Sequence, residues 1–468
     1  MTSWVSKLIV TLSLVGELVG FAQCKDQWVQ QFSALPSGVL SNGSPSMVVD
    51  QQGNILVTNV VASADTILAG GQAFPETNSF PPNSDVFIAK YSSLGSLVWF
   101  KTILGNGDCS SFDIEVDDSA NVYVCGLMQN SIEVDGLIIE RPLAPQPGFF
   151  ILKFNSEGDL QWFHKGDYRG SRCYRISWTG ASLAFAIPYS DSLNLDGQIF
   201  YSEGGQDMVM GSISSNGTFL SSFNVGGTGT LEANSLSCGT TTCIVQGRFD
   251  QELSLDGTTL NTGDFGRFGI YQIEVSLNGS LLWANSSVSP SNIDPRVYGL
   301  DLLNDSVAAF AGHYFNAAFQ LDGFTMPPPV ETDVFIGSVN RSTGSVTWLE
   351  NVTGDSFEGV TSLVSTDFGF ITAGTFHSQS ISYNGNGLTN SIDGQNDGMS
   401  LLLDTNGNWV CGQVYEGFGQ NGVLQIDRFD DGRLAILLYF NGTVVFEGNT
   451  YTSIGGYDLL LIRACPLC

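Results

Sequence analysis

The stretch DVFIAKYSSLGSLVW, residues 85–99, decides the fold. An apolar run, a polar turn that ends in Gly95 and a second apolar run that ends in Trp99 are typical of two antiparallel strands joined by a tight turn. The pattern returns at residues 148–162, 207–221, 269–283, 333–348 and 397–411. The turn glycines are Gly95, Gly158, Gly217, Gly279, Gly344 and Gly407, spaced by 63, 59, 62, 65 and 63 residues. A fixed period of this length predicts a solenoid, a propeller or an array.

Each repeat holds a second hairpin upstream, in which short apolar runs flank a polar turn, as at residues 47–57, 113–124, 360–372 and 423–437. Four strands per repeat make one blade of a β-propeller. A further ribbon with a two-residue turn separates the second strand from the third, at Asp135-Gly136, Asp196-Gly197, Asp256-Gly257, Asp322-Gly323, Asn384-Gly385 and Glu447-Gly448. We interpret these pairs as tight turns rather than a row of cation sites, because Asp and Asn tolerate the left-handed conformation and Gly has no Cβ.

The two ends of the chain predict how the ring closes. A further third strand begins near Asp458, and the chain stops where its turn glycine would stand. Its missing partner is at the other end, where Trp28 stands in the position of the repeat tryptophan. We therefore predict an all-β, seven-bladed β-propeller with four antiparallel strands per blade, closed by the N-terminal strand. Residues 23–468 form its single domain.

Residues 1–22 have the layout of a secretory signal peptide, with Lys7, an apolar run over residues 8–15 and small residues up to Ala22. Cleavage after Cys24 is the alternative. The apolar run is too short to cross a hydrocarbon core of about 30 Å. We expect a secreted, extracellular chain with no transmembrane segment after signal removal.

The amino-acid composition argues against one class of binding partner. The chain has 468 residues, 17 Lys+Arg against 46 Asp+Glu and a net charge of −29, which argues against a nucleic-acid partner. With 43% hydrophobic residues it can bury a large core.

The stretches at residues 85–99 and 113–126 resemble the bacterial-type β-propeller repeat family (SBBP-like). The resemblance covers essentially the whole mature chain and weakens in the third, fourth and seventh blades. It implies a propeller fold and frequently an extracellular setting, and it carries no single activity and no catalytic residues. Ser221 and Cys411 depart from it where Trp is expected, as do Gly148 and Gly269 in place of the leading Asp.

Nine cysteines in a chain with a signal peptide favour disulfides. Cys238 and Cys243 flank one short turn and are expected to pair. Cys24 maps to the closing turn beside Cys465 and Cys468, so a disulfide there would lock the ring. Cys109 and Cys173 stand before the first strands of neighbouring blades and are a further candidate pair, whereas Cys125 lies inside a strand and is expected to be a buried thiol.

Eight Asn-X-Ser/Thr sequons are glycosylation candidates if the source is a eukaryote or its virus, at Asn42, Asn216, Asn278, Asn285, Asn304, Asn340, Asn351 and Asn441.

No catalytic motif and no cofactor site emerges from the sequence. His164, His313 and His377 share no metal-ligand spacing. Calcium is the one cation that the sequence leaves possible. Residues 50–54 and 404–408 carry oxygen ligands at loop spacing, although they lack the twelve-residue calcium-binding frame. The repeat tryptophans are interpreted as packing between blades rather than as sugar-stacking residues: Trp28, Trp99, Trp162, Trp283 and Trp348. Arg172, Arg175, Asp294 and Arg296 stand near the starts of first strands and are the channel-mouth candidates.

Two classes of function remain. The preferred one is a secreted non-catalytic propeller that acts as an extracellular binding or structural module with a protein or glycan partner. The alternative is an extracellular carbohydrate-active enzyme with its site at the central channel mouth. Carboxylates that converge at that mouth, with a bound cation, would favour the enzyme.

Overall fold

The computed structural model describes residues 27–35, 39–40, 45–62, 66–75, 84–141, 147–166, 171–263, 266–390 and 394–467. The predicted signal peptide, Cys24, Asn42 and Cys468 lie outside these ranges. Within them every regular element is a β-strand. A search of the same residues for a helix long and apolar enough to cross a membrane finds none.

The fold is an all-β β-propeller, as predicted. Antiparallel meanders of four strands follow one another along the chain, and each runs from an innermost to an outermost strand. In this order the meanders are β3 (Ser46–Val49), β4 (Ile55–Ala62), β7 (Ser84–Tyr91) and β8 (Leu97–Asn106); β9 (Cys109–Val116), β10 (Val122–Met128), β13 (Gly148–Phe154) and β14 (Leu160–Lys165); β15 (Arg175–Trp178), β16 (Ser182–Tyr189), β19 (Asp207–Ser214) and β20 (Phe219–Val225); β21 (Leu231–Cys238), β22 (Thr242–Phe249), β25 (Gly269–Ser276) and β26 (Leu281–Val288); β27 (Arg296–Leu302), β28 (Val307–Phe315), β31 (Thr332–Asn340) and β32 (Val346–Val352); β33 (Glu358–Ser365), β34 (Gly369–Phe376), β37 (Asp397–Asp404) and β38 (Trp409–Tyr415); and β40 (Asn421–Arg428), β41 (Leu434–Phe440), β44 (Asp458–Ala464) and β1 (Trp28–Leu35).

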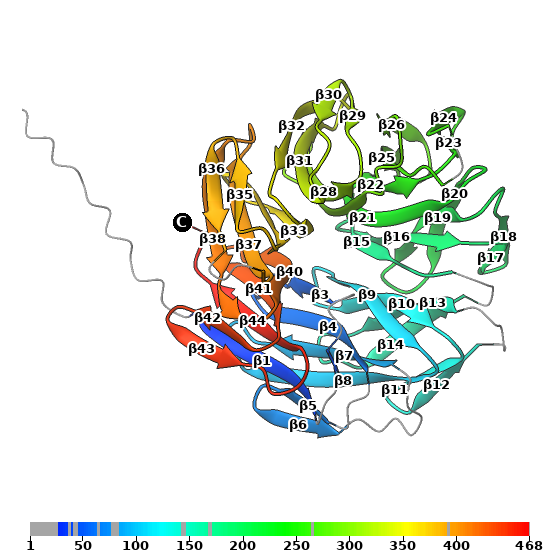
Figure 1. Ribbon diagram of the computed structural model, residues 1–468. Coiled ribbons are helices and arrows are strands. Elements are labelled where there is room, and N and C mark those ends of the chain that lie inside the picture. The colour runs from blue at the N-terminus through cyan, green and yellow to red at the C-terminus, as the bar shows by residue number, and fades with distance from the viewer. Residues whose placement is uncertain are drawn as a thin grey trace, which may run out of the picture.

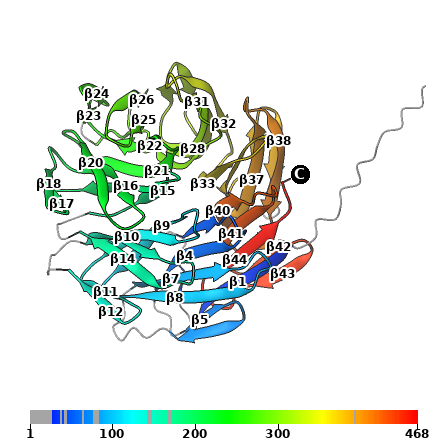
Figure 2. The same cartoon turned by 180° about the vertical axis from the view of Figure 1, so that it is seen from behind.

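The N-terminal strand closes the ring as predicted. β1 pairs antiparallel with β44, and Trp28 lies opposite Arg463. Figures 1 and 2 show the chain running round the ring from blue to red, with blue β1 beside red β44. Because β1 pairs with the outer edge of β44, that edge is not left unpaired at the seam.

The ribbons between second and third strands form hairpins of their own: β5 (Thr66–Ala69) with β6 (Gln72–Pro75), β11 (Ser131–Val134) with β12 (Leu137–Glu140), β17 (Ser192–Leu195) with β18 (Gln198–Tyr201), β23 (Glu252–Leu255) with β24 (Thr258–Asn261), β29 (Phe319–Leu321) with β30 (Phe324–Met326), β35 (Ser380–Tyr383) with β36 (Asn386–Thr389), and β42 (Thr443–Phe446) with β43 (Asn449–Thr452). Two short strands, β2 (Val39–Leu40) and β39 (Gly417–Phe418), complete the set, pairing with β4 and β42.

The prediction of seven blades with four strands each is not confirmed. The strands of the described chain join into eleven hydrogen-bonded sheets of two to seven strands. The reason is that ribbons cross the junctions: β5 pairs with β1, β11 with β8 and β29 with β26. An inserted ribbon thus continues the outermost strand of the preceding meander, and the boundary between blades is bridged by backbone hydrogen bonds.

The turns of these ribbons confirm the tight-turn interpretation. Asp135 and Gly136 have φ of 51° and 78°, and the five other predicted pairs repeat this geometry with φ between 47° and 90°. Two consecutive residues with positive φ define the type I′ hairpin turn, whose twist matches that of the flanking strands. An added Cβ at Gly136 would meet nothing within 4 Å, so this glycine is needed for its conformation alone.

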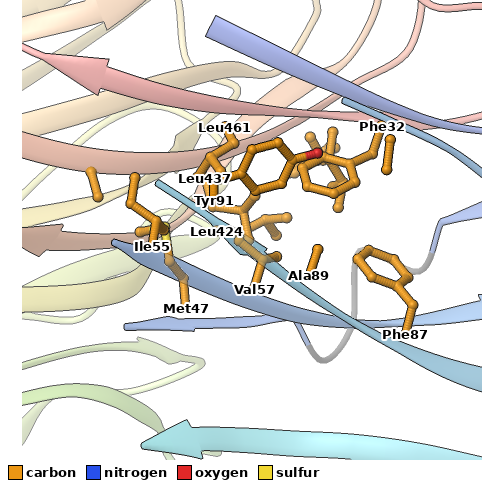
Figure 3. Packing of buried hydrophobic residues seen from close by; sticks show 14 of the residues in the cluster. Phe32, Met47, Ile55, Val57, Phe87, Ala89, Tyr91, Leu424, Leu437 and Leu461 are labelled. Carbon is orange, nitrogen blue, oxygen red and sulfur yellow. The ribbon is translucent and has the colours of Figure 1, made fainter. Parts of the chain in front are cut away.

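Apolar layers between neighbouring meanders form the core. At the seam, Phe32 of β1, Val57 of β4, Tyr91 of β7 and Leu461 of β44 are fully buried in one cluster (Figure 3). The Phe32 and Tyr91 rings pack edge to face, with their centroids 5.5 Å apart. Burial of a side chain of this size stabilises the fold by about 1.5–3 kcal/mol, so the seam is held by packing as well as by strand pairing.

The repeat tryptophans lie against the turn glycines of the next meander, and we call these contacts the Trp belt. An added Cβ at Gly344 would come within 2.7 Å of the Trp283 ring, and Gly95 and Gly407 are equally close to Trp28 and Trp348. Each indole Nε1–H also donates to a carbonyl of that next turn: Trp28 to Ser93, Trp99 to Ser156, Trp162 to Ser215, Trp283 to Arg341 and Trp348 to Thr405. Packing between blades is therefore confirmed for this series.

Ser221 replaces tryptophan at one position of the Trp belt, and it keeps the polar half of the contact. Its hydroxyl donates to the Leu277 carbonyl at 2.6 Å. The apolar half is supplied by Phe223, whose ring lies 2.7 Å from the position of an added Cβ at Gly279.

Candidate functional site

The innermost strands β3, β9, β15, β21, β27, β33 and β40 line a cavity of about 500 Å³ at the centre of the ring. Its wall carries the carboxyl groups of Asp113 and Glu115 on β9, Asp301 on β27 and Asp427 on β40, with Arg175 at the start of β15. These groups come from strands far apart in the sequence. Carboxyl groups of different blades therefore line the wall of one channel.

The same carboxyl groups hold neighbouring blades together. At each step between adjacent innermost strands, a polar side chain bonds a group on the next strand, and we call these contacts the inner ring. They comprise Ser46 Oγ to Asp113 (3.0 Å), Ile176 N to Asp113 (3.0 Å), Cys238 N to Ser177 Oγ (3.2 Å), Ser235 Oγ to Val297 O (3.1 Å), Ser365 N to Asp301 (2.7 Å), Ile426 N to Ser362 Oγ (3.2 Å) and Val49 N to Asp427 (2.7 Å). Asp113, Asp301 and Asp427 accept four of these seven bonds.

Burial raises the pKa of these channel acids. It raises the pKa of Asp427 to about 7, and it raises the pKa of Asp113 and of Asp301 despite the hydrogen bonds that each accepts. The pKa of Glu115 is raised well above its usual value by burial and then by the nearby charges of Asp113 and Asp427. Near neutral pH the channel therefore carries less negative charge than its acidic residues suggest.

The four channel-mouth candidates do not form one site. Arg175 lines the cavity and donates to the carbonyls of Asn234 (2.5 Å) and Phe112 (3.2 Å), so it bridges β15 to both neighbouring blades. Arg172 is exposed and donates to the Tyr174 hydroxyl at 2.9 Å. Asp294 and Arg296 lie outside the cavity lining and are joined to each other at 2.7 Å.

Asp294 and Arg296 belong to a charged network at the start of β27. Arg248 is bound in a bidentate manner by Glu232 (2.8 Å for both pairs), and it also contacts Asp294 at 2.6 Å. The Arg248 guanidinium stacks on Phe268, 4.4 Å from the ring centroid. Glu232 and Asp294 therefore neutralise the charges of Arg248 and Arg296, which is typical of an ion network with a structural role.

The three histidines do not share a site. His164 packs against Trp162 and Phe219, and burial lowers its pKa. His313 is buried, and burial lowers its pKa to about 4. His377 Nδ1 lies 3.0 Å from the hydroxyl of Ser356. In the described residues no group of three or more His, Cys, Asp or Glu side chains is placed to hold a metal.

The turns at residues 50–54 and 404–408, which carry the possible calcium ligands, use their aspartate oxygens in hydrogen bonds within the turn. Asp50 Oδ1 accepts the amides of Gln52 (3.0 Å) and Asn54 (2.8 Å). Asp404 accepts the amides of Asn406 and Asn408 in the same way, at 2.8 and 2.9 Å. Asp50 is buried and also pairs with Lys90 at 3.2 Å, so it is a structural cap of its turn.

The cysteines give one predicted pair and one correction. Cys238 and Cys243 are joined by a disulfide. Cys109 and Cys173 are free, because Cys109 is buried in the layer on one face of the β9–β14 meander and Cys173 in the layer on the other. Cys125 is a buried thiol as predicted and donates to the Cys173 carbonyl at 3.1 Å. Cys465 is disulfide-bonded, and so is Cys411, which was not among the candidates.

The described sequons differ in exposure. Asn216, Asn278, Asn304 and Asn441 are exposed, whereas Asn285, Asn340 and Asn351 are half-buried. The side-chain nitrogen of Asn285 donates to the Gly344 carbonyl, so a glycan at this position would cost that contact.

The inner-ring carboxylates were not predicted from the sequence. Glu115, Asp301 and Asp427 stand 186 and 126 residues apart, close to three and two repeat periods, and they occupy the same register position of the first strand. Alignment of the repeats at the first strand would have shown these three acids at one position, with Asp113 two residues before Glu115. Asp333 and Glu358 were not predicted either, because they are buried and come together only at a junction between blades.

Comparison with known proteins shows no family for this chain. No protein-family model and no curated protein sequence matches this chain. Similar solved structures include a mitotic checkpoint complex at 11% identity and a TM-score of 0.42, covering 99% of this chain and 100% of that chain. The C-terminal WD40 domain of Sif2 has 9% identity and a TM-score of 0.38, covering 93% and 97%, and the Neurospora crassa Pan2 WD40 domain has 7% and 0.29, covering 93% and 95%. At these values the likeness says nothing of partners or activity.

Proposed function

We propose that this protein is a secreted, non-catalytic β-propeller that binds an extracellular protein or glycan, or serves as an extracellular structural module. The propeller fold suggests a binding or structural module. The observation that carries the non-catalytic part is the inner ring: Asp113, Asp301 and Asp427 accept backbone amides of the neighbouring blades. Carboxylates used in this way stabilise the ring rather than await a substrate.

Secretion rests on the signal-peptide layout of residues 1–22, and the resemblance to the bacterial-type β-propeller repeat family supports an extracellular setting. Expression of the full chain in a secreting host should release a protein whose N-terminus is Gln23 or Lys25. Retention of residues 1–22 in the released protein would contradict this part of the proposal. N-terminal sequencing gives the answer directly.

The second candidate is an extracellular carbohydrate-active enzyme. One observation favours it: carboxyl groups from three blades line one cavity, and burial raises the pKa of Asp427 to about 7, where a general acid would be protonated. Its weakness is that Asp427 already accepts the Val49 amide at 2.7 Å.

Two measurements distinguish the binding module from the carbohydrate-active enzyme. The mature protein is screened on glycan and protein arrays, and it is incubated with a panel of soluble polysaccharides while reducing ends are counted. Saturable binding without new reducing ends supports the module. Turnover that is abolished in Asp427→Asn and Glu115→Gln variants would establish the enzyme instead.

A further inference from the structure

Where a third strand has an aspartate at its start, this aspartate usually accepts a nearby N–H group. Asp85 Oδ1 accepts the Gly105 amide at 2.6 Å, and Asp207 Oδ1 accepts that of Gly227 at 3.2 Å. At the junction between β37 and β40 the donor is a side chain: Asn421 Nδ2 donates to Asp397 Oδ1 at 2.8 Å. Asn421 Oδ1 in turn accepts the Gly398 amide at 2.8 Å, so a neutral amide satisfies this junction.

The preceding junction has a second acid where Asn421 would stand. Asp333 leads β31 as Asp397 leads β37, and Glu358 begins β33 as Asn421 begins β40. Asp333 is 3% exposed and Glu358 is fully buried. Gly354 lies against both groups: its amide donates to Asp333, and the Glu358 Oε1 atom is 2.5 Å from the position of an added Gly354 Cβ.

One oxygen of each acid lacks a partner. Asp333 Oδ1 and Glu358 Oε2 are buried and accept no hydrogen bond from the described residues. Two buried carboxylates at one junction repel each other, and an unpaired buried charge is costly. Burial raises the pKa of Asp333 to about 6, and burial together with the charge of Asp333 raises the pKa of Glu358 to about 7.

The surrounding groups do not neutralise the pair. Asp355 is exposed on the adjoining loop, and Glu331 and His377 both contact the Ser356 hydroxyl, at 3.1 and 3.0 Å. His313 packs its ring against Phe357 at 5.9 Å, and burial lowers its pKa to about 4, so it is neutral near pH 7. Arg296, whose charge reaches His313, is paired with Asp294.

Glu358 also anchors the loop that leads into β33. The Ser378 hydroxyl donates to Glu358 Oε1 and accepts the amides of Asp355 (2.9 Å) and Ser356 (2.8 Å). The amide of His377 donates to the Phe357 carbonyl at 2.8 Å. A change at Glu358 is thus passed through one hydroxyl to residues 355–356.

We propose that Asp333 and Glu358 each hold a proton at acidic pH, and that loss of these protons loosens the β31–β33 junction and the loop 353–357. The junction then acts as a pH-sensitive anchor, whereas the Asp397–Asn421 junction has a neutral amide in place of the second acid. The protons are taken from water and returned to it. Two carboxyl groups offer four oxygens at most, fewer than the six to eight that Ca²⁺ prefers, so a proton fits the site better than that cation.

The sign of the effect follows from the raised pKa values of Glu358 and Asp333. Groups whose pKa is raised by folding stabilise the folded state below their ordinary pKa, near 4. This stabilisation is lost as the pH rises through about 6 to 7. The pair should therefore hold the loop most firmly near pH 4.5 and least firmly near pH 8.

Hydrogen exchange of the mature protein tests the proposal, with exchange rates corrected for intrinsic pH dependence. In the wild type, protection of residues 353–357 should fall about tenfold or more between pH 5 and pH 8. In Glu358→Gln, whose amide can donate to Asp333 as Asn421 does to Asp397, protection should stay constant within about twofold. Asn421→Asp is the matched variant: it places two acids at the control junction and should make protection around residue 421 depend on pH.

Three results would overturn the proposal. One is equal pH dependence in the wild type and Glu358→Gln. Another is a constant wild-type protection factor from pH 5 to pH 8. The third is a rise in Tm at pH 8 on addition of 1 mM CaCl₂ that Glu358→Gln lacks, which would assign the site to a cation instead of a proton. If Asn421→Asp does not fold, the comparison of wild type with Glu358→Gln still decides.

Discussion

The inner ring and the Trp belt hold the same junctions by opposite means. Toward the channel, half-buried acids such as Asp301 and Asp427 accept backbone amides of the neighbouring blade at 2.7 Å. Further out, an indole such as Trp283 covers the turn glycine of the next blade and donates a hydrogen bond to that turn. The inner contacts depend on charge and the outer contacts on apolar area.

This difference teaches where each kind of residue can be used. The channel contains water-accessible space, so a polar side chain there keeps part of its solvation while it bonds the next strand. The belt lies between packed sheets, where apolar area contributes most. Loss of a belt contact should therefore cost more stability than loss of an inner contact, and only the inner contacts should respond to pH.

The largest effect is expected for Trp283→Ala. Trp283 is 8% exposed, covers Gly344 and donates to Arg341 O at 2.8 Å. Truncation of a buried aromatic residue should lower the free energy of unfolding by about 3–5 kcal/mol. Chemical denaturation measures the loss, with Leu220→Ala as the control, because Leu220 is 60% exposed on an outer strand. A loss no larger than that of the control would show that the belt contributes little.

A smaller effect is expected for Gly344→Ala. Gly344 has φ +74°, and an added Cβ would come within 2.7 Å of the Trp283 ring. The matched control is Gly136→Ala, where φ is +78° and nothing lies within 4 Å of the added atom. The left-handed conformation alone costs about 1–2 kcal/mol for a non-glycine residue. We expect about that loss at Gly136 and roughly 1–2 kcal/mol more at Gly344, because overpacking adds to it.

Equal losses at the two glycines would contradict the belt. They would mean that the Trp283 side chain moves aside without cost, and that Gly344 is needed only for its turn. Thermal unfolding of the two variants side by side makes the comparison, since both substitutions add a single methyl group.

Much of this fold could be predicted because the repeat exposes it. The turn glycines and the repeat tryptophans recur at one spacing, and Trp28 before the first blade predicted the pairing of β1 with β44. The pairing of ribbons with a preceding blade could not be predicted. It depends on how far each ribbon reaches beyond its own sheet, and period-two patterning does not contain that distance.

The site was harder to predict for a physical reason. Chemistry at a junction is made by residues from different repeats, such as Asp333 and Glu358, and neither looks unusual within its own strand. The failed pairing of Cys109 with Cys173 has the same origin: these cysteines precede or begin the first strands of neighbouring blades, but they lie in different layers of the core. A repeat predicts which positions are equivalent, and only packing decides which of them meet.

The smallest effect is expected for Asp427→Asn, and it tests the charge of the inner ring. Asp427 accepts the amides of Val49 and Arg428, each at 2.7 Å, and burial raises its pKa to about 7. Folding thus raises this pKa above its ordinary value near 4, so the stabilisation is complete below pH 4 and is lost as the pH rises through 7.

An asparagine cannot ionise, so Asp427→Asn should lose less stability than the wild type between pH 4 and pH 7. The difference should be roughly 1 kcal/mol, because channel water screens the carboxylate. Urea unfolding at a series of pH values measures it, with Trp283→Ala as the control whose pH dependence should match the wild type. A parallel pH profile for Asp427→Asn would show that the inner ring does not depend on charge, and the contrast with the Trp belt would then reduce to apolar area alone.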